Sequence, residues 1–171
     1  MACNQILNGL MRDCQPSMGG IVEAHAINRE YVKEITAADG QISAITLEDS
    51  QKFHSFYFNR NTGSMTSNYT LDPATGVRYV TTDLVLQFNR METAKRIEVT
   101  ALAQNELALI VKDANGKYWL LGKDEPVMAT AGEGVTGTAR GDRNGYGITL
   151  QDTSLEMPYE VEASIVAALL A

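Results

Sequence analysis

The sequence contains several short patterns that could do chemistry, and the most specific of them spans residues 132–137. These residues, Gly-Glu-Gly-Val-Thr-Gly, match G-x-G-x-x-G. That motif binds dinucleotides when it follows a strand and opens a helix whose N-terminus holds the pyrophosphate. Residues 138–142 instead have a loop sequence, and Glu133 would place a negative charge inside the phosphate cradle. We therefore expect this chain to bind no nucleotide and no other cofactor.

The side chains that could bind metal or act as nucleophiles are few and scattered. His25 and His54 fall in separate predicted strands, and neither has Cys or carboxylate residues at metal-ligand spacing. Cys3 and Cys14 lack the local signature of a nucleophile, although pairing of a Cys with a distant His stays open. Because no set of positioned catalytic groups can be assembled, we expect that the protein has no metal site and is not an enzyme.

Two tripeptides match known surface motifs. Arg140-Gly141-Asp142 is the tripeptide of cell adhesion, but matches of three residues arise by chance, and Gly and Asp are common in loops. Asn68-Tyr69-Thr70 fits the N-glycosylation sequon. Residues 1–20 lack a basic head followed by an apolar core, so we expect no export signal and no glycan.

Length and charge limit the function classes that are possible. A chain of 171 residues suits one domain with a sizeable core. Its net charge of −7 argues against binding nucleic acid by counterion release, yet it is compatible with DNA passing along a channel without adhering. The longest apolar run, residues 165–171, is too short to cross a bilayer, so we expect no membrane insertion.

Short apolar runs bounded by turn residues predict a mainly β fold. The predicted strands are residues 21–27, 42–47, 53–58, 79–88, 107–111, 118–121, 126–130, 147–150 and 159–165. Asn115-Gly116 between two of them is the strongest hairpin signal in the chain. We expect residues 1–19 to form an N-terminal segment and residues 20–171 to form a single β-sandwich or barrel with one flanking helix.

The flanking helix is predicted at about residues 90–104. Asn89 followed three residues later by Glu92 resembles a capping box at its start. The helix has one apolar stripe, formed by Ala94, Ile97 and Ala101 with Leu102 at its margin.

Three other segments each allow two interpretations. Residues 29–35 could be a short helix or a loop. In residues 1–19, apolar side chains at near-helical spacing (Ile6, Leu7, Leu10 and Met11) indicate either a short helix or an ordered tail. The uncharged C-terminal run 165–171 could pack on the chain's own core, or it could be buried by a neighbouring subunit.

Residues 59–78 form a long, polar arm between two predicted strands. Connections longer than about 12 to 15 residues are commonly functional or disordered. The arm is therefore either a mobile loop or a hairpin that docks on an adjacent subunit. On the second interpretation, the subunit-interface residues expected here and at the C-terminus are Thr62, Met65, Tyr69, Leu71, Val77, Ile165, Leu169 and Leu170.

The order of these elements resembles that of the major tail-tube proteins of long-tailed bacteriophages. The resemblance covers most of the chain after Gly20 and rests on the segments 53–58, 59–78, 79–88, 92–104, 109–122, 142–150 and 158–161. It implies a β-sandwich or barrel with one helix, assembled into hexameric rings whose sheets form a continuous inner barrel. It also implies that the rings stack, with the arm and the chain ends contacting adjacent rings.

The same resemblance implies partners and a location. The tape-measure protein would occupy the lumen during assembly, and tail terminator and baseplate proteins would bind the ends of the tube. DNA would pass through an acidic lumen without specific binding. The subunit would be made in the cytoplasm of the bacterial host and reside in the tail of the virion.

Two alternatives remain. A head–tail connector or a tail terminator would share the fold and the ring. A monomeric β-barrel module that binds a small ligand or a glycan belongs to a different class of function. Its pocket would be lined by aromatic side chains, namely Phe56, Tyr57, Tyr118 and Trp119.

Overall fold

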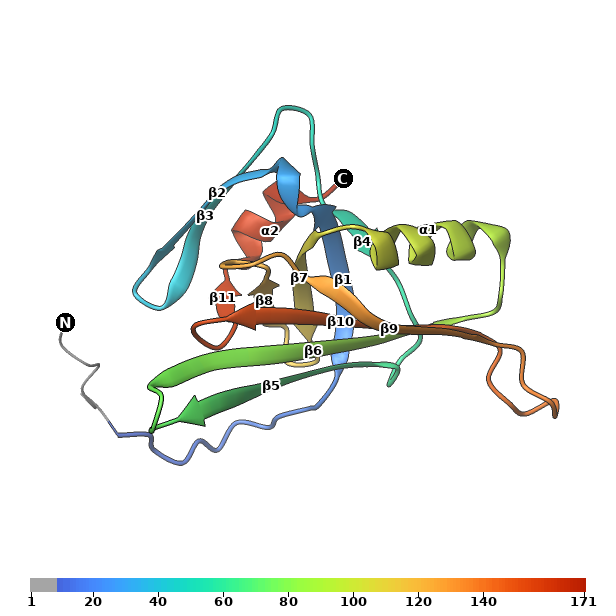
Figure 1. Cartoon of the computed structure of the whole chain (residues 1–171), viewed down its shortest axis with the longest axis horizontal. Helices are drawn as coiled ribbons and strands as arrows, with labels where there is room; N and C mark the ends of the chain where they lie inside the picture. The colour runs from blue at the N-terminus through green and yellow to red at the C-terminus, as the bar shows by residue number, and fades with distance from the viewer. Residues whose placement is uncertain (1–8) are drawn as a thin grey trace.

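The computed structural model describes residues 9–171, which fold into two β-sheets packed face to face with two helices (Figure 1). The first sheet has seven strands in the order β2-β3-β11-β8-β7-β1-β4. All of its neighbours are antiparallel except β11 and β3. Its strands are β1 (Ile21–Asn28), β2 (Val32–Ala38), β3 (Gln41–Leu47), β4 (His54–Phe56), β7 (Leu107–Asp113), β8 (Tyr118–Leu121) and β11 (Tyr159–Val161).

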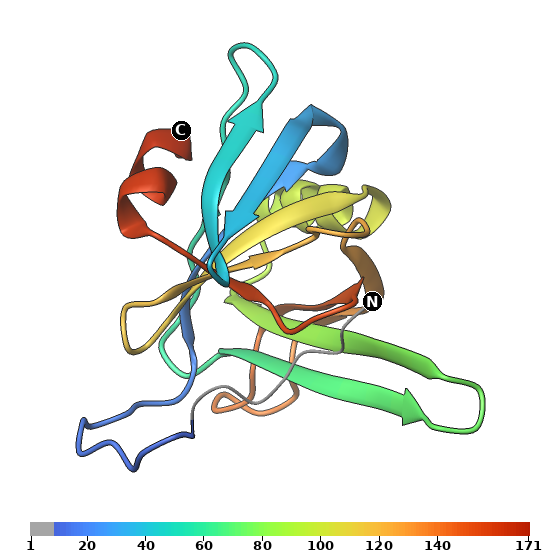
Figure 2. The same cartoon turned by 90° about the vertical axis from the view of Figure 1, so that its left-hand side faces the viewer.

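The second sheet has four antiparallel strands in the order β5-β6-β10-β9. They are β5 (Gly63–Asp72), β6 (Val77–Asn89), β9 (Met128–Val135) and β10 (Gly145–Ser154). The end of the β5–β6 hairpin projects beyond the rest of the sandwich (Figure 2).

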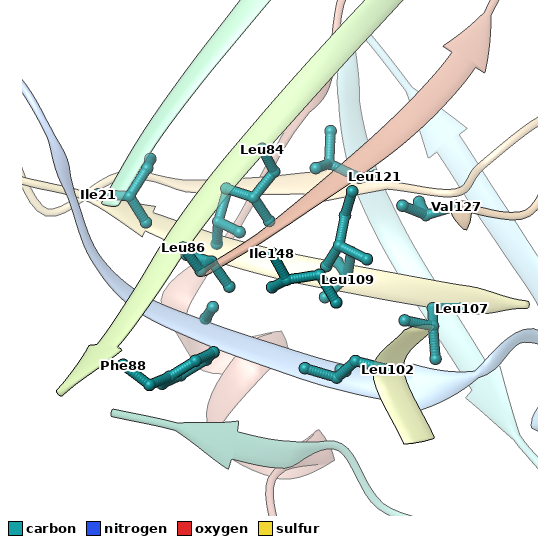
Figure 3. Close-up of a cluster of buried hydrophobic side chains, with 14 residues drawn as sticks. Ile21, Leu84, Leu86, Phe88, Leu102, Leu107, Leu109, Leu121, Val127 and Ile148 are labelled. Carbon is teal, nitrogen blue, oxygen red and sulfur yellow. The ribbon is translucent and has the colours of Figure 1, made fainter. Parts of the chain in front are cut away.

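The main core lies between the two sheets (Figure 3). Along β6, Leu84, Leu86 and Phe88 alternate with partly exposed residues, so every second side chain points inward. Ile148 and Leu150 on β10 do the same. They meet the apolar side chains of β1 and β7, including Leu109 and Val111. Strand alternation in the four-stranded sheet therefore determines which of its faces points outward.

A second apolar cluster lies on the opposite face of the seven-stranded sheet. Val166 and Leu169 of α2 (Ala163–Leu169) pack there with Phe53, Ile110 and Leu120. Since both faces of β7 are covered, all of its first five residues are buried, as expected for a strand without polar alternation.

The structure confirms the predicted sandwich and corrects two details of it. The described sheets do not close into a barrel, because β2, β4, β5 and β9 remain at edges. Residues 9–171 contain two α-helices rather than one. The run 159–165, predicted as a strand, leaves the sheet after Val161 and enters α2, because helical spacing buries Val166 and Leu169 together.

Helix α1 (Thr93–Gln104) is confirmed, but its cap and its buried stripe were predicted wrongly. Glu92 is the N-cap and makes no side-chain capping bond. The entry to the helix is instead held by Asn144, whose side-chain oxygen accepts from the Met91 N–H at 2.8 Å. The predicted stripe faces solvent, with Ile97 53% exposed, while Leu102 is buried with Val99 packed beside it.

The arm 59–78 is largely regular structure. All ten residues of β5 pair with β6, from Gly63 opposite Leu86 to Asp72 opposite Val77. Its beginning belongs to the body: a Cβ on Gly63 would lie 2.6 Å from the Phe58 ring. The arm is therefore a paired hairpin whose far end protrudes.

Three smaller expectations are also resolved. Residues 29–35 form one turn of 3-10 helix, Arg29–Tyr31, and then enter β2. The predicted strand 53–58 is shorter, since only His54–Phe56 pair with β1. Residues 9–19 contain no helix; Ile6 and Leu7 lie outside the described residues. The hairpin at Asn115-Gly116 is confirmed, with Gly116 at a positive φ of 85°.

We expect replacement of Ile110 by Ala to lower the free energy of unfolding by about 2 to 5 kcal/mol, because it leaves a cavity beneath α2. Ile97→Ala is the matched control, and it should change stability by less than about 0.5 kcal/mol, since Ile97 is mostly exposed. Chemical denaturation of the two variants measures both values. Equal losses would show that the burial of Ile110 is wrongly assigned.

Candidate assembly surfaces

The two edges of the four-stranded sheet are long and nearly uncharged. Strand β5 has ten residues whose only charged side chain is that of Asp72 at its end. Strand β9 has eight residues, mostly exposed, and Glu133 is its only charged residue. Long edge strands without charge or Pro are templates for pairing with another chain, because their outer N–H and C=O groups have no strand partner.

The edges of the seven-stranded sheet are protected in ordinary ways. Strand β4 has only three residues. Strand β2 carries Lys33 and Glu34, both exposed. Short length and charge are the usual features that prevent edge pairing. The contrast within one molecule singles out β5 and β9 as surfaces that could join strands of other copies.

The outer face of the four-stranded sheet is polar but carries little charge. Its central side chains are Thr81, Asp83, Val85 and Gln87 of β6, and Thr149, Gln151 and Thr153 of β10. The carboxylate of Asp83 accepts from the Gln151 amide at 2.8 Å. On the same side, Arg143 forms an ion pair with Glu133. Each charge of that ion pair is therefore opposed by its partner.

The far end of the hairpin exposes apolar side chains. Leu71 is 62% exposed, and Tyr69 and Val77 are also exposed. The turn itself is well defined, since the Asp72 carboxylate accepts from the Ala74 N–H at 2.9 Å. The Thr75 hydroxyl and this N–H stabilise the carboxylate and lower the pKa of Asp72. A paired hairpin end with exposed apolar residues suits a contact surface.

The other predicted interface residues serve the chain's own fold. The Thr62 hydroxyl donates to the Asn59 and Gln87 carbonyls at 2.5 and 3.3 Å. Met65 packs against the main core. Leu169 is buried in the second cluster, and Ile165 and Leu170 pack against that cluster. Of the two interpretations of the C-terminal run, the structure supports packing on the chain's own core.

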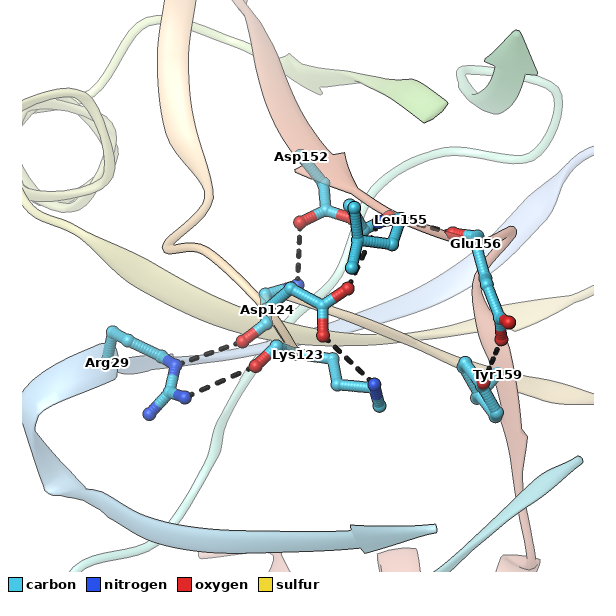
Figure 4. A network of polar contacts seen from close by, with 9 residues as sticks. Arg29, Lys123, Asp124, Asp152, Leu155, Glu156 and Tyr159 are labelled. Carbon is cyan, nitrogen blue, oxygen red and sulfur yellow. Dashed lines mark hydrogen bonds and ion pairs between the residues drawn. The ribbon is translucent and has the colours of Figure 1, made fainter. Parts of the chain in front are cut away.

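A polar network surrounds the connection between β8 and β9 (Figure 4). The Asp152 carboxylate, on β10, accepts from the Gly122 N–H at 3.0 Å. Arg29 donates to the Gly122 and Lys123 carbonyls at 3.0 and 3.4 Å. Asp124 accepts from the Leu155 N–H at 3.1 Å. The connection between β8 and β9 is thus held to both sheets.

The pKa values of Asp152 and Tyr159 in this network are both raised, for different reasons. Asp152 is almost fully buried, and burial raises the pKa of its carboxyl despite the bond from Gly122. The Tyr159 hydroxyl donates to Glu156, and this bond raises the pKa of Tyr159 to about 12. The contacts of both groups are made within the chain's own strands and connections, so the network has a structural explanation.

The motifs that suggested chemistry have structural roles. Residues 132–135 of G-x-G-x-x-G lie on edge strand β9, and no helix follows them. The Asp142 carboxylate of the adhesion tripeptide accepts from the Thr138 and Ala139 N–H groups at 2.9 and 2.7 Å, and these bonds lower the pKa of Asp142. That carboxylate is therefore engaged within its own loop.

Metal-ligating and aromatic side chains are also dispersed. Within residues 9–171, no cluster of three His, Cys, Asp or Glu side chains could hold a metal. Cys14 is exposed, and Cys3 lies outside the described residues. Trp119 packs against the main core, whereas Tyr118 packs against the second cluster. The four aromatic residues of the predicted ligand pocket therefore do not line one cavity.

His25 is the one buried histidine among the described residues. It is 2% exposed, and its Nδ1 lies 2.9 Å from the Ser55 hydroxyl oxygen. Its Nε2 lies 3.6 Å from a Glu23 carboxylate oxygen, and Glu23 is paired with Lys112. Burial lowers the pKa of His25, although Glu23 opposes that shift. The surroundings of His25 in the folded state therefore favour its neutral form.

A groove between α1 and β4 is the feature that the sequence analysis missed. Its lining includes Phe56 and Tyr57 from the β4 segment, Phe88 of β6, and Lys95, Glu98 and Val99 of α1. It continues toward Ile27 and Asn28 of β1. The only available signal was the aromatic run at residues 53–58 on both faces of a predicted strand. We call this feature the α1–β4 groove.

Comparison of the chain with protein-family models, curated proteins and solved structures found no match. In the part of the chain that the structure describes, neither helix has the length and apolar character needed to cross a bilayer.

The buried His25 predicts a dependence of stability on pH. Because its pKa in the folded state is below the ordinary value of 6.5, the unfolded chain binds more protons near that pH. Stability is thus full above about pH 6.5 and falls as the pH drops toward the folded pKa, by at most about 1.4 kcal/mol per pH unit.

We expect His25→Gln to flatten this part of the profile, measured by urea denaturation between pH 5 and pH 8. His54→Gln, on the exposed side of β4, is the matched control and should leave the slope unchanged. A profile that keeps its wild-type slope in His25→Gln would contradict the assignment.

Proposed function

We propose that this chain is a structural subunit that assembles with copies of itself, and that it is the tail-tube subunit of a long-tailed bacteriophage. The observation that carries the proposal is the pair of long, nearly uncharged edges, β5 and β9, on a sheet whose companion sheet has protected edges. Two such edges would promote aggregation of a protein that stays monomeric, because each can pair with a strand of another chain.

Lateral pairing of β5 from one copy with β9 of the next removes both edges. If the rotation between successive copies closes, this heterologous contact forms a ring. The four-stranded sheets then form one continuous wall, as the tail-tube resemblance implies for a hexamer. The strands β5, β6 and β10 run along the long axis of the molecule (Figure 1), so this pairing is a sideways contact.

The outer face of the four-stranded sheet suits the lining of a channel. It offers Thr, Gln and Val side chains, and its Arg143 is opposed by Glu133. Such a surface lacks the unopposed cations that hold phosphate groups. DNA could pass it without specific binding, and a tape-measure protein could occupy it during assembly.

The hairpin end provides contacts of a second kind. Tyr69, Leu71 and Val77 are exposed near the end of the β5–β6 hairpin, which projects from the sandwich. In a stacked assembly these side chains would meet the adjacent ring, and at the tube ends they would meet terminator or baseplate proteins. This role needs no catalytic group, so we propose that the protein is not an enzyme and that it resides in the virion tail.

The proposal predicts that one charge on the β5 edge prevents polymerisation. Thr66→Lys places an ammonium group on this edge, and we expect it to raise the protein concentration needed for assembly by about tenfold or more. Thr36→Lys, on edge strand β2, is the matched control and should assemble normally.

Sedimentation and negative-stain electron microscopy of the purified chain provide the readout. Long tubes support a tail-tube subunit, whereas assembly that stops at one ring supports a connector or terminator. Wild-type protein that stays monomeric at millimolar concentration, or equal effects of the two substitutions, would reject the proposal.

A further inference from the structure

The α1–β4 groove lies between an edge strand and a helix. Strand β4 pairs with β1 on one side, and no other strand of the described residues pairs with it on the opposite side. Phe56 of β4 forms one wall of the groove, and Ala94, Glu98 and Val99 of α1 form the other. A groove of this kind binds an extended peptide by strand addition, in which the main chain pairs with the edge and alternate side chains enter the groove.

The open side of the β4 segment already accepts one short backbone pairing. The Phe53 N–H donates to the Leu169 carbonyl at 2.9 Å, and the Ala171 N–H donates to the Phe53 carbonyl at 3.1 Å. Alternate residues of a strand direct their backbone groups to the same side, so Ser55 directs its N–H and carbonyl to this open side as well. In residues 9–171 no strand pairs with Ser55 there. The edge therefore has a free position for an added strand.

The groove contains one charge that its own surroundings leave uncompensated. The Lys95 ammonium donates to the Asn89 carbonyl at 2.7 Å and lies 3.7 Å from the Glu92 carboxylate. Glu98 lines both parts of the groove, and it forms no ion pair with any described residue. The electrostatic complement of the groove is therefore a cation placed beside Glu98.

The walls and this charge together define the chemistry of an occupant. Side chains of an added strand alternate between its two faces, so every second one points toward α1. One of these meets the apolar wall made by Phe56, Phe88 and Val99, which favours an apolar side chain. The next one on the same face, two residues along, lies beside Glu98, which favours Lys or Arg.

We propose that the α1–β4 groove binds an extended segment of a different protein, in which an apolar and a basic side chain are two residues apart. The proposal goes beyond the proposed function and does not depend on it, because the groove is separate from the outer edges of β5 and β9. Other copies of this chain fit the groove poorly. The chain has a net charge of −7, and its long open edges β5 and β9 contain neither Lys nor Arg.

The short length of β4 suits a selective contact. Three residues provide too few backbone hydrogen bonds for the edges of two β4 strands to pair strongly with each other. In strand addition the main chain gives affinity, and pockets for alternate side chains give specificity. With so short an edge, the side chains in the groove must supply much of the affinity, so binding should depend on the sequence of the occupant.

The first experiment tests the chemistry of the occupant with a synthetic peptide. The probe is fluorescein-labelled Thr-Leu-Thr-Lys-Thr-Leu-Thr, which offers an apolar and a basic side chain two residues apart in either strand direction. We expect it to bind the full chain with a Kd of about 1 mM or lower, measured by fluorescence anisotropy. The same peptide with Glu in place of Lys should bind about fivefold or more weakly, because its carboxylate faces Glu98. Equal binding of the two peptides, or no binding of either, would overturn the proposal.

The second experiment locates the peptide with a pair of matched variants. Ala94→Tyr fills the groove from α1, and we expect it to weaken binding of the Lys peptide by about tenfold or more. Ala103→Tyr is the control and should bind like the wild type, because nine positions along a helix are about two and a half turns and place Ala103 on the opposite side. Both alanines are exposed, so both variants should fold. Equal affinities of the two variants would reject the groove as the site.

A third variant tests the charge alone. Glu98→Gln keeps the shape of the side chain, and it should weaken binding of the Lys peptide by about two- to fivefold, as expected for an exposed ion pair. The loss should shrink at high salt, because salt screens the interaction between exposed charges. An unchanged affinity in Glu98→Gln would contradict the role assigned to this carboxylate.

NMR spectroscopy of the Thr66→Lys variant tests strand addition separately from assembly. We expect the Ser55 amide resonance to shift and its hydrogen exchange to slow when the Lys peptide is added, while the Thr36 amide on β2 stays unchanged. Peptide binding by this variant supports the inference whether or not the wild type forms tubes. An unchanged Ser55 amide would overturn strand addition. If Ala94→Tyr instead prevented assembly of the otherwise wild-type chain, the occupant would be another copy and the inference would fail.

Discussion

The structure depends above all on the pairing of β6 within the four-stranded sheet. This strand has thirteen residues, longer than the sandwich needs, and it pairs with β5 on one side and β10 on the other. Its alternate side chains Leu84, Leu86 and Phe88 enter the core. The same alternation sends polar residues to the outer face and carries the hairpin past the body. The pairing of β6 with β5 and β10 therefore sets three features: the core, the polar outer face and the projecting hairpin end.

The seven-stranded sheet supports this arrangement from the other side. Its central strand β7 is buried on both faces, by the main core and by the cluster beneath α2. Asp152 and Arg29 then hold the connection between β8 and β9 to both sheets. The outer edges of β5 and β9 pair with no other described strand, although Met65 of β5 and Ala129 of β9 pack against the main core.

The features predictable from sequence are those set by neighbouring residues. The Asn115-Gly116 turn and the alternating strand before Phe88 are local patterns, and the structure confirms both. Where prediction was wrong, a distant contact decided the outcome. Asn144 holds the start of α1 in place of the expected capping box, and the sandwich buries Leu102 rather than the stripe through Ile97. The C-terminal run forms α2, and its Val166 and Leu169 pack on the second apolar face of β7.

For the candidate surfaces the same division holds. The amino-acid sequence by itself indicated a β-rich acidic chain and a long polar arm at residues 59–78, and it left open whether that arm is a loop or a hairpin. Only the tertiary structure decided that β5 and β9 lie at the two edges of one sheet and that α1 leaves a groove beside β4. Strand order and groove both arise from packing between residues far apart in the chain. The strand order and the groove therefore cannot be predicted from the pattern of neighbouring residues.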